Sequence, residues 1–419
     1  MLWRSPRFEG QEASGRPLSP KAQEVLLSPW LALVARLVSV GLFLLVLAAC
    51  FFGDQGPFVN IAPTFIWVVF WLGLVPVVVI FGDVWRVLSP WKALADLLAF
   101  LSRSAGVSWR VFEYPERAGI WPAAVLLFFF AGLELAYINP SSPKALGLAT
   151  VIYSAVTWLG MFVFGREVWA SRGEAFAVYF GFLSRLAPFA LRARPDGEDE
   201  IVVRKPLVGL ADRVLLPGTL AFVAVMLGSV SFDGLSRSSR WQNWYYETVL
   251  SQDSPEAGDR LGMALNFAGL LACVLAVALA YLTAIGLARL LISADRPLAP
   301  LFVYSLVPIA LAYAIAHYFS LLYYQGQWAV RLASDPLGRG WDLFGSADYA
   351  AQAHTLSPNT IWYVQVASLV CGHVIALVLA HDRAVATFRT VYSAILAQFA
   401  LLALMVLYTV GGLWILSQG

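Results

Sequence analysis

Charged residues are scarce in this 419-residue chain, and so are histidines. Only 13% of its residues are charged and four are histidines, whereas 60% are hydrophobic. Soluble domains carry roughly 25% charged residues, so this composition excludes an ordinary soluble protein. The formal net charge of +2 offers no basic excess for nucleic acid, and we expect no such partner. The sequence predicts an integral membrane protein whose main partner is the lipid bilayer.

Cysteine is also rare, and several catalytic motifs are missing. Cys50, Cys273 and Cys371 all lie inside apolar runs, which favours small buried side chains over disulfides or thiolate metal sites. The sequence has no His-Glu-x-x-His, no Gly-x-Ser-x-Gly, no phosphate-binding glycine loop and no Cys-x-x-Cys. Assignments that depend on these motifs are therefore excluded.

In place of such motifs, the chain contains long apolar runs. About 20 apolar residues in a helix cross the hydrocarbon core of a bilayer. Nine such runs are found, at residues 28–52, 63–82, 118–138, 144–165, 213–231, 262–290, 299–324, 360–381 and 388–415. The sequence therefore predicts an all-α fold, a polytopic transmembrane helix bundle of about nine spans.

The distribution of Lys and Arg predicts how this bundle is oriented. The N-terminal tail and the loops on its side of the membrane hold about 20 of these residues, and the other loops hold about 7. Because basic loops stay in the cytoplasm, we expect a cytoplasmic N-terminus and an external C-terminus. The expected location is a bacterial inner membrane.

A highly charged stretch divides the spans into two groups. We expect a polar cytoplasmic tail at 1–27, an N-terminal membrane bundle at 28–191, a charged cytoplasmic loop at 192–212, and a C-terminal bundle with two long outer loops at 213–419. Aromatic-rich spans joined by short loops also suit contacts with other membrane proteins as partners.

A helix too short to span is predicted after Ser89, which suits an N-cap position before Pro90. Residues 90–103 separate apolar from charged side chains, so this helix should lie along the cytoplasmic interface. A similar pattern returns about 85 residues later, where Ser171 and Glu174 are spaced as a capping box. The two copies predict a parallel repeat with one or two interfacial amphipathic helices, as some transporters have.

Ionisable side chains inside the spans mark the candidate site, because burying them in a membrane is costly. Glu134 and His317 fall in the outer halves of their spans, and His373 lies near the middle of its own. Tyr313 precedes His317 by one helical turn. We expect these residues to converge, with Glu134, His317 and Tyr313 as catalytic groups and His317, His373 and Glu134 as ligands of one divalent metal ion. The alternative for each is a buried side chain that is hydrogen-bonded locally.

Several motifs along the chain carry a family resemblance. They are Gly82-Asp83-Val84-Trp85-Arg86-Val87-Leu88-Ser89-Pro90-Trp91, Ala316-His317-Tyr318, Gly340-Trp341-Asp342 and Ala380-His381-Asp382-Arg383. With them the chain resembles bacterial polytopic membrane proteins labelled fenitrothion hydrolase. The resemblance implies hydrolysis of a lipid-soluble ester, for which a metal-bound water is a workable nucleophile.

Two other functions remain open. The repeat and the Glu134/His317 pair favour a proton-coupled transporter or permease. The aromatic spans and short loops alone also suit a non-catalytic subunit of a membrane complex.

Overall fold

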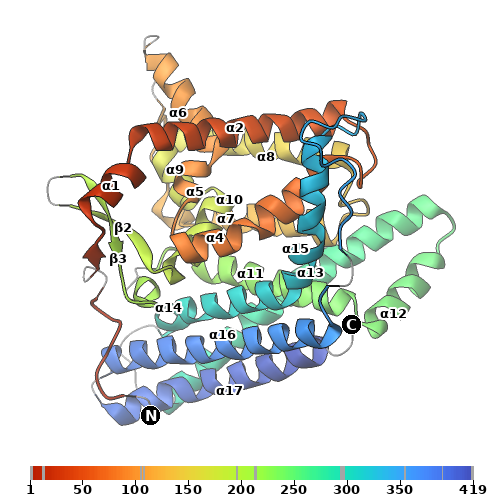
Figure 1. Ribbon diagram of the computed structural model, residues 1–419. Helices are drawn as coiled ribbons and strands as arrows, with labels where there is room; N and C mark the ends of the chain where they lie inside the picture. Colours follow the sequence, from red (N-terminus) through yellow and green to blue (C-terminus); the bar gives the residue numbers. More distant parts are fainter. Residues whose placement is uncertain are drawn as a thin grey trace.

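The protein is a bundle of long apolar helices (Figure 1). The computed structural model describes residues 3–11, 15–103, 106, 109–194, 197–211, 215–292, 298–352, 355–388 and 390–416. Within these residues, nine helical segments are long and apolar enough to cross a membrane, which confirms the predicted all-α polytopic bundle. They are formed by α2 (Pro29–Phe52), α3 to α4 (Ile61–Phe81), α7 (Trp121–Leu135), α8 (Pro143–Phe164), α11 (Thr219–Ser236), α13 (Pro255–Leu291), α14 to α15 (Ala299–Ser334), α16 (Pro358–Thr387) and α17 (Val391–Leu416).

The bundle has two distinct ends. In Figure 1, α2, α8, α16 and α17 run across the view, with the β-strands and α1 (Pro20–Leu26) on the left and α12 (Ser239–Leu250) on the right. We call these the sheet end and the loop end. Residues 335–352, which follow α15, also lie at the loop end.

Three short strands form an antiparallel sheet of order β1-β3-β2. They are β1 (Arg16–Pro17), β2 (Phe189–Ala193) and β3 (Asp199–Val203). Residues 192–212 were expected to form a charged loop, and the structure corrects this, because their first half belongs to a hairpin. Gly197 has a φ of 87° in the turn, and Arg192 pairs with Glu200 across the strands at 2.7 Å. The β-branched run Ile201-Val202-Val203 favours the strand.

Two of the spans are interrupted. In the second, a π-helix, η2 (Phe65–Leu72), separates α3 (Ile61–Thr64) from α4 (Leu74–Phe81). In the seventh, α14 (Ala299–Phe302) and a 3₁₀ turn, η7 (Val303–Leu306), precede α15 (Val307–Ser334). Proline removes a backbone donor in both, at Pro76 and Pro308. Irregular turns inside membrane helices often accompany binding sites.

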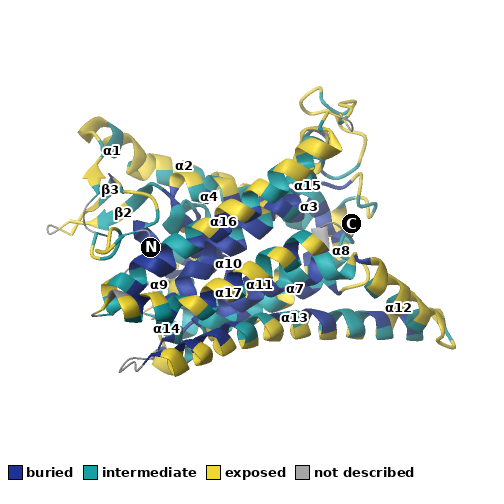
Figure 2. Ribbon diagram, turned by 90° about the horizontal axis from the view of Figure 1, so that it is seen from below, coloured by how far each residue is buried: buried dark blue, intermediate teal, exposed yellow. Residues whose placement is uncertain are grey.

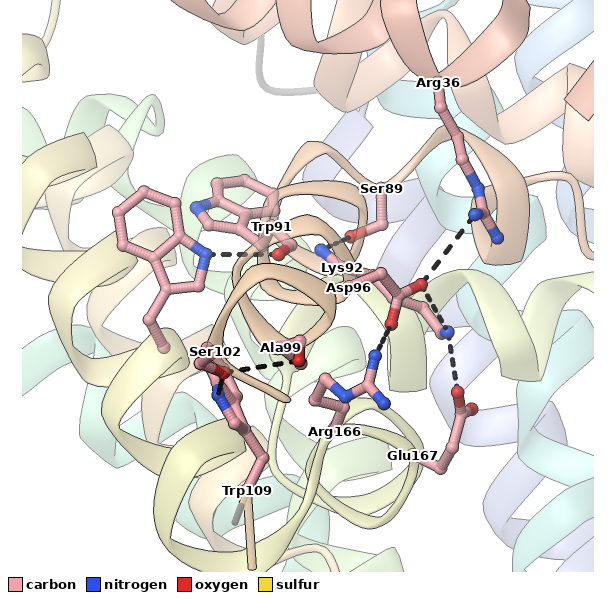
Figure 3. Close-up of polar contacts among 11 residues, drawn as sticks. Arg36, Ser89, Trp91, Lys92, Asp96, Ala99, Ser102, Trp109, Arg166 and Glu167 are labelled. Carbon is pink, nitrogen blue, oxygen red and sulfur yellow. Dashed lines mark hydrogen bonds and ion pairs between the residues drawn. The ribbon is translucent and has the colours of Figure 1, made fainter. Parts of the chain in front are cut away.

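The short helix predicted after Ser89 is α6 (Pro90–Ser102), and Ser89 Oγ caps it by accepting from Lys92 N at 3.3 Å. α6 points away from the bundle in Figure 1, beyond α5 (Trp85–Leu88). Its apolar residues divide between two environments, since Trp91 is buried whereas Leu98 and Leu101 are exposed. Its charged face turns to protein instead of water: Asp96 contacts Arg36, Lys92 and Arg166 (Figure 3).

The second copy of the pattern folds differently from the first. It forms α9 (Arg166–Arg172) and α10 (Ala175–Leu183), and α10 is buried inside the bundle. α10 is therefore not an interfacial helix, because its side chains are apolar on every face. The predicted capping box is also wrong: Ser171 lies within α9 and donates to Val168 O at 3.1 Å. Glu174 itself caps α10, accepting from Phe176 N at 2.9 Å and Ala177 N at 2.7 Å.

Buried residues are frequent in α10, α11 and the first half of α15, and apolar residues stay exposed on the outer helices (Figure 2). Leu279 of α13 and Leu407 of α17 are examples of such outward-facing side chains. An exposed apolar surface of this kind fits contact with lipid. Cys50 is buried as expected, but Cys371 is exposed on this outer surface.

Candidate functional site

An aspartate and a histidine form an ion pair between α11 and α15. Asp233, one turn before the end of α11, is only 3% exposed, and its Oδ2 contacts His317 Nε2. Arg237 Nε donates to the other oxygen, Asp233 Oδ1, at 3.0 Å. The Arg237 side chain is 62% exposed, so Asp233 joins a cation at the loop-end surface to a histidine inside the bundle. No other polar partner of His317 Nε2 is present in the described part of the chain.

A second carboxyl group lies next to this pair. Glu134, near the end of α7, accepts a hydrogen bond from Tyr318 Oη at 3.2 Å. Tyr318 follows His317 in α15, and the two rings are perpendicular with centroids 4.8 Å apart. Glu134 and His317 therefore belong to one polar cluster, joined through Tyr318.

This cluster borders a small cavity between the two halves of the chain. Glu134 and Tyr318 line it, and so does Trp71, whose buried Nε1 has no hydrogen-bond partner among the described residues. Helices η2, α4, α7 and α10 form its walls on one side, and α11 and α15 form the others. Both interrupted spans thus reach the cavity. Its remaining lining is Leu72, Val75, Leu127, Ala131, Tyr179, Met226, Ser229, Val230, Ala310 and Ala314.

His373 occupies a separate, neighbouring position. Its Nδ1 lies 2.8 Å from Leu369 O, and its buried Nε2 has no hydrogen-bond partner in the part of the chain that the structure describes. A carbonyl oxygen only accepts, so Nδ1 carries the proton and neutral His373 keeps a free lone pair on Nε2. The ring packs on Tyr313 at 6.1 Å and Tyr408 at 6.3 Å between centroids. Tyr313, one turn before His317, thus connects His373 to α15.

The predicted metal site is not formed by these residues. Asp233 engages His317, Tyr318 engages Glu134, and a backbone carbonyl engages His373. Nowhere in the described residues do three or more His, Cys, Asp or Glu side chains gather as metal ligands. Tyr313, predicted to act beside His317, instead donates to Tyr408 O at 2.9 Å.

Sequence reasoning missed Asp233, which is the main partner of His317. The fifth span was predicted to end at residue 231, so Asp233 was counted with the outer loop, whereas the helix continues to Ser236. The four-residue spacing of Asp233 and Arg237, which pairs opposite charges on one helix face, was the available signal.

No protein-family model matches the sequence, and no curated protein or solved structure matches it either. The chemistry of the site therefore follows from its own groups. Two carboxyl groups and an imidazole are groups that accept and release protons, and here they form one cluster whose member Glu134 lines a cavity inside a membrane protein.

Proposed function

We propose that this protein is a proton-coupled membrane transporter in which Asp233, His317 and Glu134 bind and release protons. The observation that carries the proposal is the Asp233–His317 ion pair beside a cavity lined by two interrupted spans. Secondary transporters place substrate and coupling-ion sites between the halves of the chain, where helices are discontinuous. Carboxylates and histidines within spans serve as their proton relays.

The ion pair provides a way to couple protonation to movement. When Asp233 gains a proton or His317 loses one, their mutual attraction disappears, and the contact between α11 and α15 weakens. Arg237 holds the other oxygen of the same carboxylate from the loop end, so Asp233 has both His317 and Arg237 as partners. A ligand that binds better when this contact is open would then be moved together with protons, because only differential binding shifts such an equilibrium.

His373 extends this arrangement toward the sheet end. It packs on Tyr313, which lies one helical turn from His317, and no described residue hydrogen-bonds to its Nε2. Proton-binding groups therefore lie at two positions along α15: at His317 itself, and one helical turn earlier, where His373 of α16 packs on Tyr313. From the Lys/Arg distribution, we also propose that the sheet end faces the cytoplasm of a bacterial inner membrane.

Metal-assisted hydrolysis, which the family resemblance implies, has less support. It needs a metal-bound water, and the three residues predicted to hold the metal are engaged by separate partners.

A rapid pH step applied to proteoliposomes on a solid-supported membrane tests the proposal. Proton binding inside the protein should displace charge, and Asp233→Asn or His317→Gln should reduce the displacement about tenfold. Asp348→Asn is the matched control, because Asp348 is exposed at the loop end. A wild-type signal no larger than that of protein-free liposomes would refute the transporter.

A further inference from the structure

The first described residues fold back onto the sheet end of α16, where they bind one carboxylate. Asp382 Oδ1 accepts from Trp3 Nε1 at 3.0 Å and Arg7 N at 2.6 Å. Asp382 Oδ2 accepts from Phe8 N at 2.9 Å and Glu9 N at 3.1 Å. We call residues 3–9 the N-terminal strap. All four bonds depend on the same acceptor, which is 1% exposed.

The neighbours of Asp382 hold the strap as well. The Trp3 ring packs edge-on against His381, with centroids 5.2 Å apart. His381 Nδ1 lies 3.2 Å from Gln398 Oε1 of α17, so the strap sits where α16 meets α17. Arg383 forms an ion pair with Glu9. The strap therefore contacts three consecutive residues of α16, His381, Asp382 and Arg383.

The strap is also connected to the sheet. Lys205 Nζ donates to Gln11 Oε1 at 3.2 Å, and β1 pairs with β3 a few residues further on. In Figure 1 the chain passes from the sheet down to the left-hand ends of α16 and α17. The strap thus bridges the sheet and the C-terminal helices across the sheet end.

A small cavity lies directly beneath this bridge. Glu9 of the strap lines it together with Tyr304 and Ser305 of η7 and with Asp382. The same interrupted span continues into α15, where Ala310 lines the other cavity, the one that Glu134 and Tyr318 also line. Ser305 and Ala310 are five positions apart, and this spacing corresponds to roughly 8 Å along a helix. The cavity beside the strap and the cavity at the candidate site are therefore lined by the same interrupted span.

We propose that the N-terminal strap is a releasable closure of the sheet end. Bound to Asp382, it forms a wall of the sheet-end cavity and holds α16; released, it exposes that cavity to water. Because four hydrogen bonds share one carboxylate, loss of the charge at Asp382 loosens the strap as a unit. In the closed state the strap limits the access of protons from the sheet end to Asp233 and His317. This last step rests on the proposed transport function.

Thiol accessibility tests the closure without reference to transport. In a protein whose three cysteines are replaced by alanine, Ser305→Cys places one thiol in the sheet-end cavity. In lipid nanodiscs, Asp382→Ala should make this thiol react with a membrane-impermeant maleimide at least about tenfold faster. Trp3→Ala, which alters only the strap, should have the same direction of effect if Asp382→Ala fails to fold. Asp348→Asn should leave the rate unchanged.

Charge displacement after a pH step separates the closure from transport. Faster labelling with a larger displacement supports both proposals. Faster labelling while wild type and variants all show no displacement supports the strap and refutes the transporter. An unchanged labelling rate in folded Asp382→Ala and Trp3→Ala proteins overturns the strap, whatever the displacement shows.

Discussion

Gly372 of α16 lies so close to Ala312 of α15 that no side chain fits between them. A Cβ on Gly372 would stand 2.2 Å from Ala312 Cβ and 2.9 Å from Pro308 O. Small residues let membrane helices approach at the backbone, where packing replaces the missing hydrophobic drive. This contact positions His373, the next residue, against Tyr313.

Gly372→Ala should therefore lower the melting temperature, since α15 and α16 must move apart to admit the methyl group. Gly326→Ala on α15 is the control, because a Cβ there meets nothing within 4 Å. It should be neutral or stabilising by up to about 1 kcal/mol. Size-exclusion chromatography after heating in detergent measures both. Equal melting of the two variants would contradict the close packing.

The charge cluster around α6 gives a ranked prediction. Asp96 contacts three cations, whereas Glu167 contacts one cation among the described residues, Lys92 at 2.7 Å, and its side chain is 75% exposed (Figure 3). Asp96→Asn should destabilise the protein by about 1–3 kcal/mol, because it leaves three cations together. Glu167→Gln should cost less than about 1 kcal/mol, as exposed pairs do. Thermal melts at low and high salt would show the order, and a larger effect of Glu167→Gln would disprove it.

Tyr114 should make stability depend on alkaline pH. Its hydroxyl donates to Gly119 O at 2.9 Å, and burial raises the pKa of Tyr114 above its usual range although Arg172 opposes the shift. The folded state therefore binds the phenolic proton more tightly than the unfolded state, whose pKa is about 10. This contribution is complete below pH 10 and is lost as the pH rises through the folded-state pKa.

Tyr114→Phe tests this directly. It should cost about 1 kcal/mol near neutral pH, where the hydrogen bond is intact. The difference from wild type should shrink above pH 10 in chemical unfolding experiments. A constant difference at all pH values would argue against the shift.

His373→Phe should separate fold from function. Phenylalanine keeps the ring contacts with Tyr313 and Tyr408 and removes one hydrogen bond to Leu369, so stability should fall by no more than about 1.5 kcal/mol. The charge displacement after a pH step should fall much more. A folded variant with unchanged displacement would remove His373 from the proton path.

The spans and the start of α6 were predictable from sequence because their signals are local. Hydrophobic length marks a span, and Ser89 followed by Pro90 marks a helix start. The span limits differ from those observed by a few residues in most cases, but the ten extra helical residues at the end of α15 and the late end of α11 matter. The second error moved Asp233 out of the membrane and hid the partner of His317.

The features that sequence reasoning missed depend on distant residues. α10 and α6 follow similar sequence patterns, yet α10 is buried because Trp91 and Phe70 pack on Phe176, and these two residues lie 85 and 106 positions away in the chain. The sheet likewise joins Arg16 to Val203. The sequence placed Glu134, His317 and His373 together as metal ligands, whereas in the structure each of them has its own partner, which residue spacing along a helix does not reveal.

The contacts of the strap with Asp382 set an order of events during synthesis. Phe8 and its acceptor are separated by 374 positions in the chain. While the ribosome is still adding the earlier helices, Asp382 has not been synthesised. The strap therefore lacks its acceptor. The strap binds only after α16 has been synthesised. In every earlier nascent intermediate the strap therefore does not cover the sheet end. Attachment of the strap thus requires that α16 has been made.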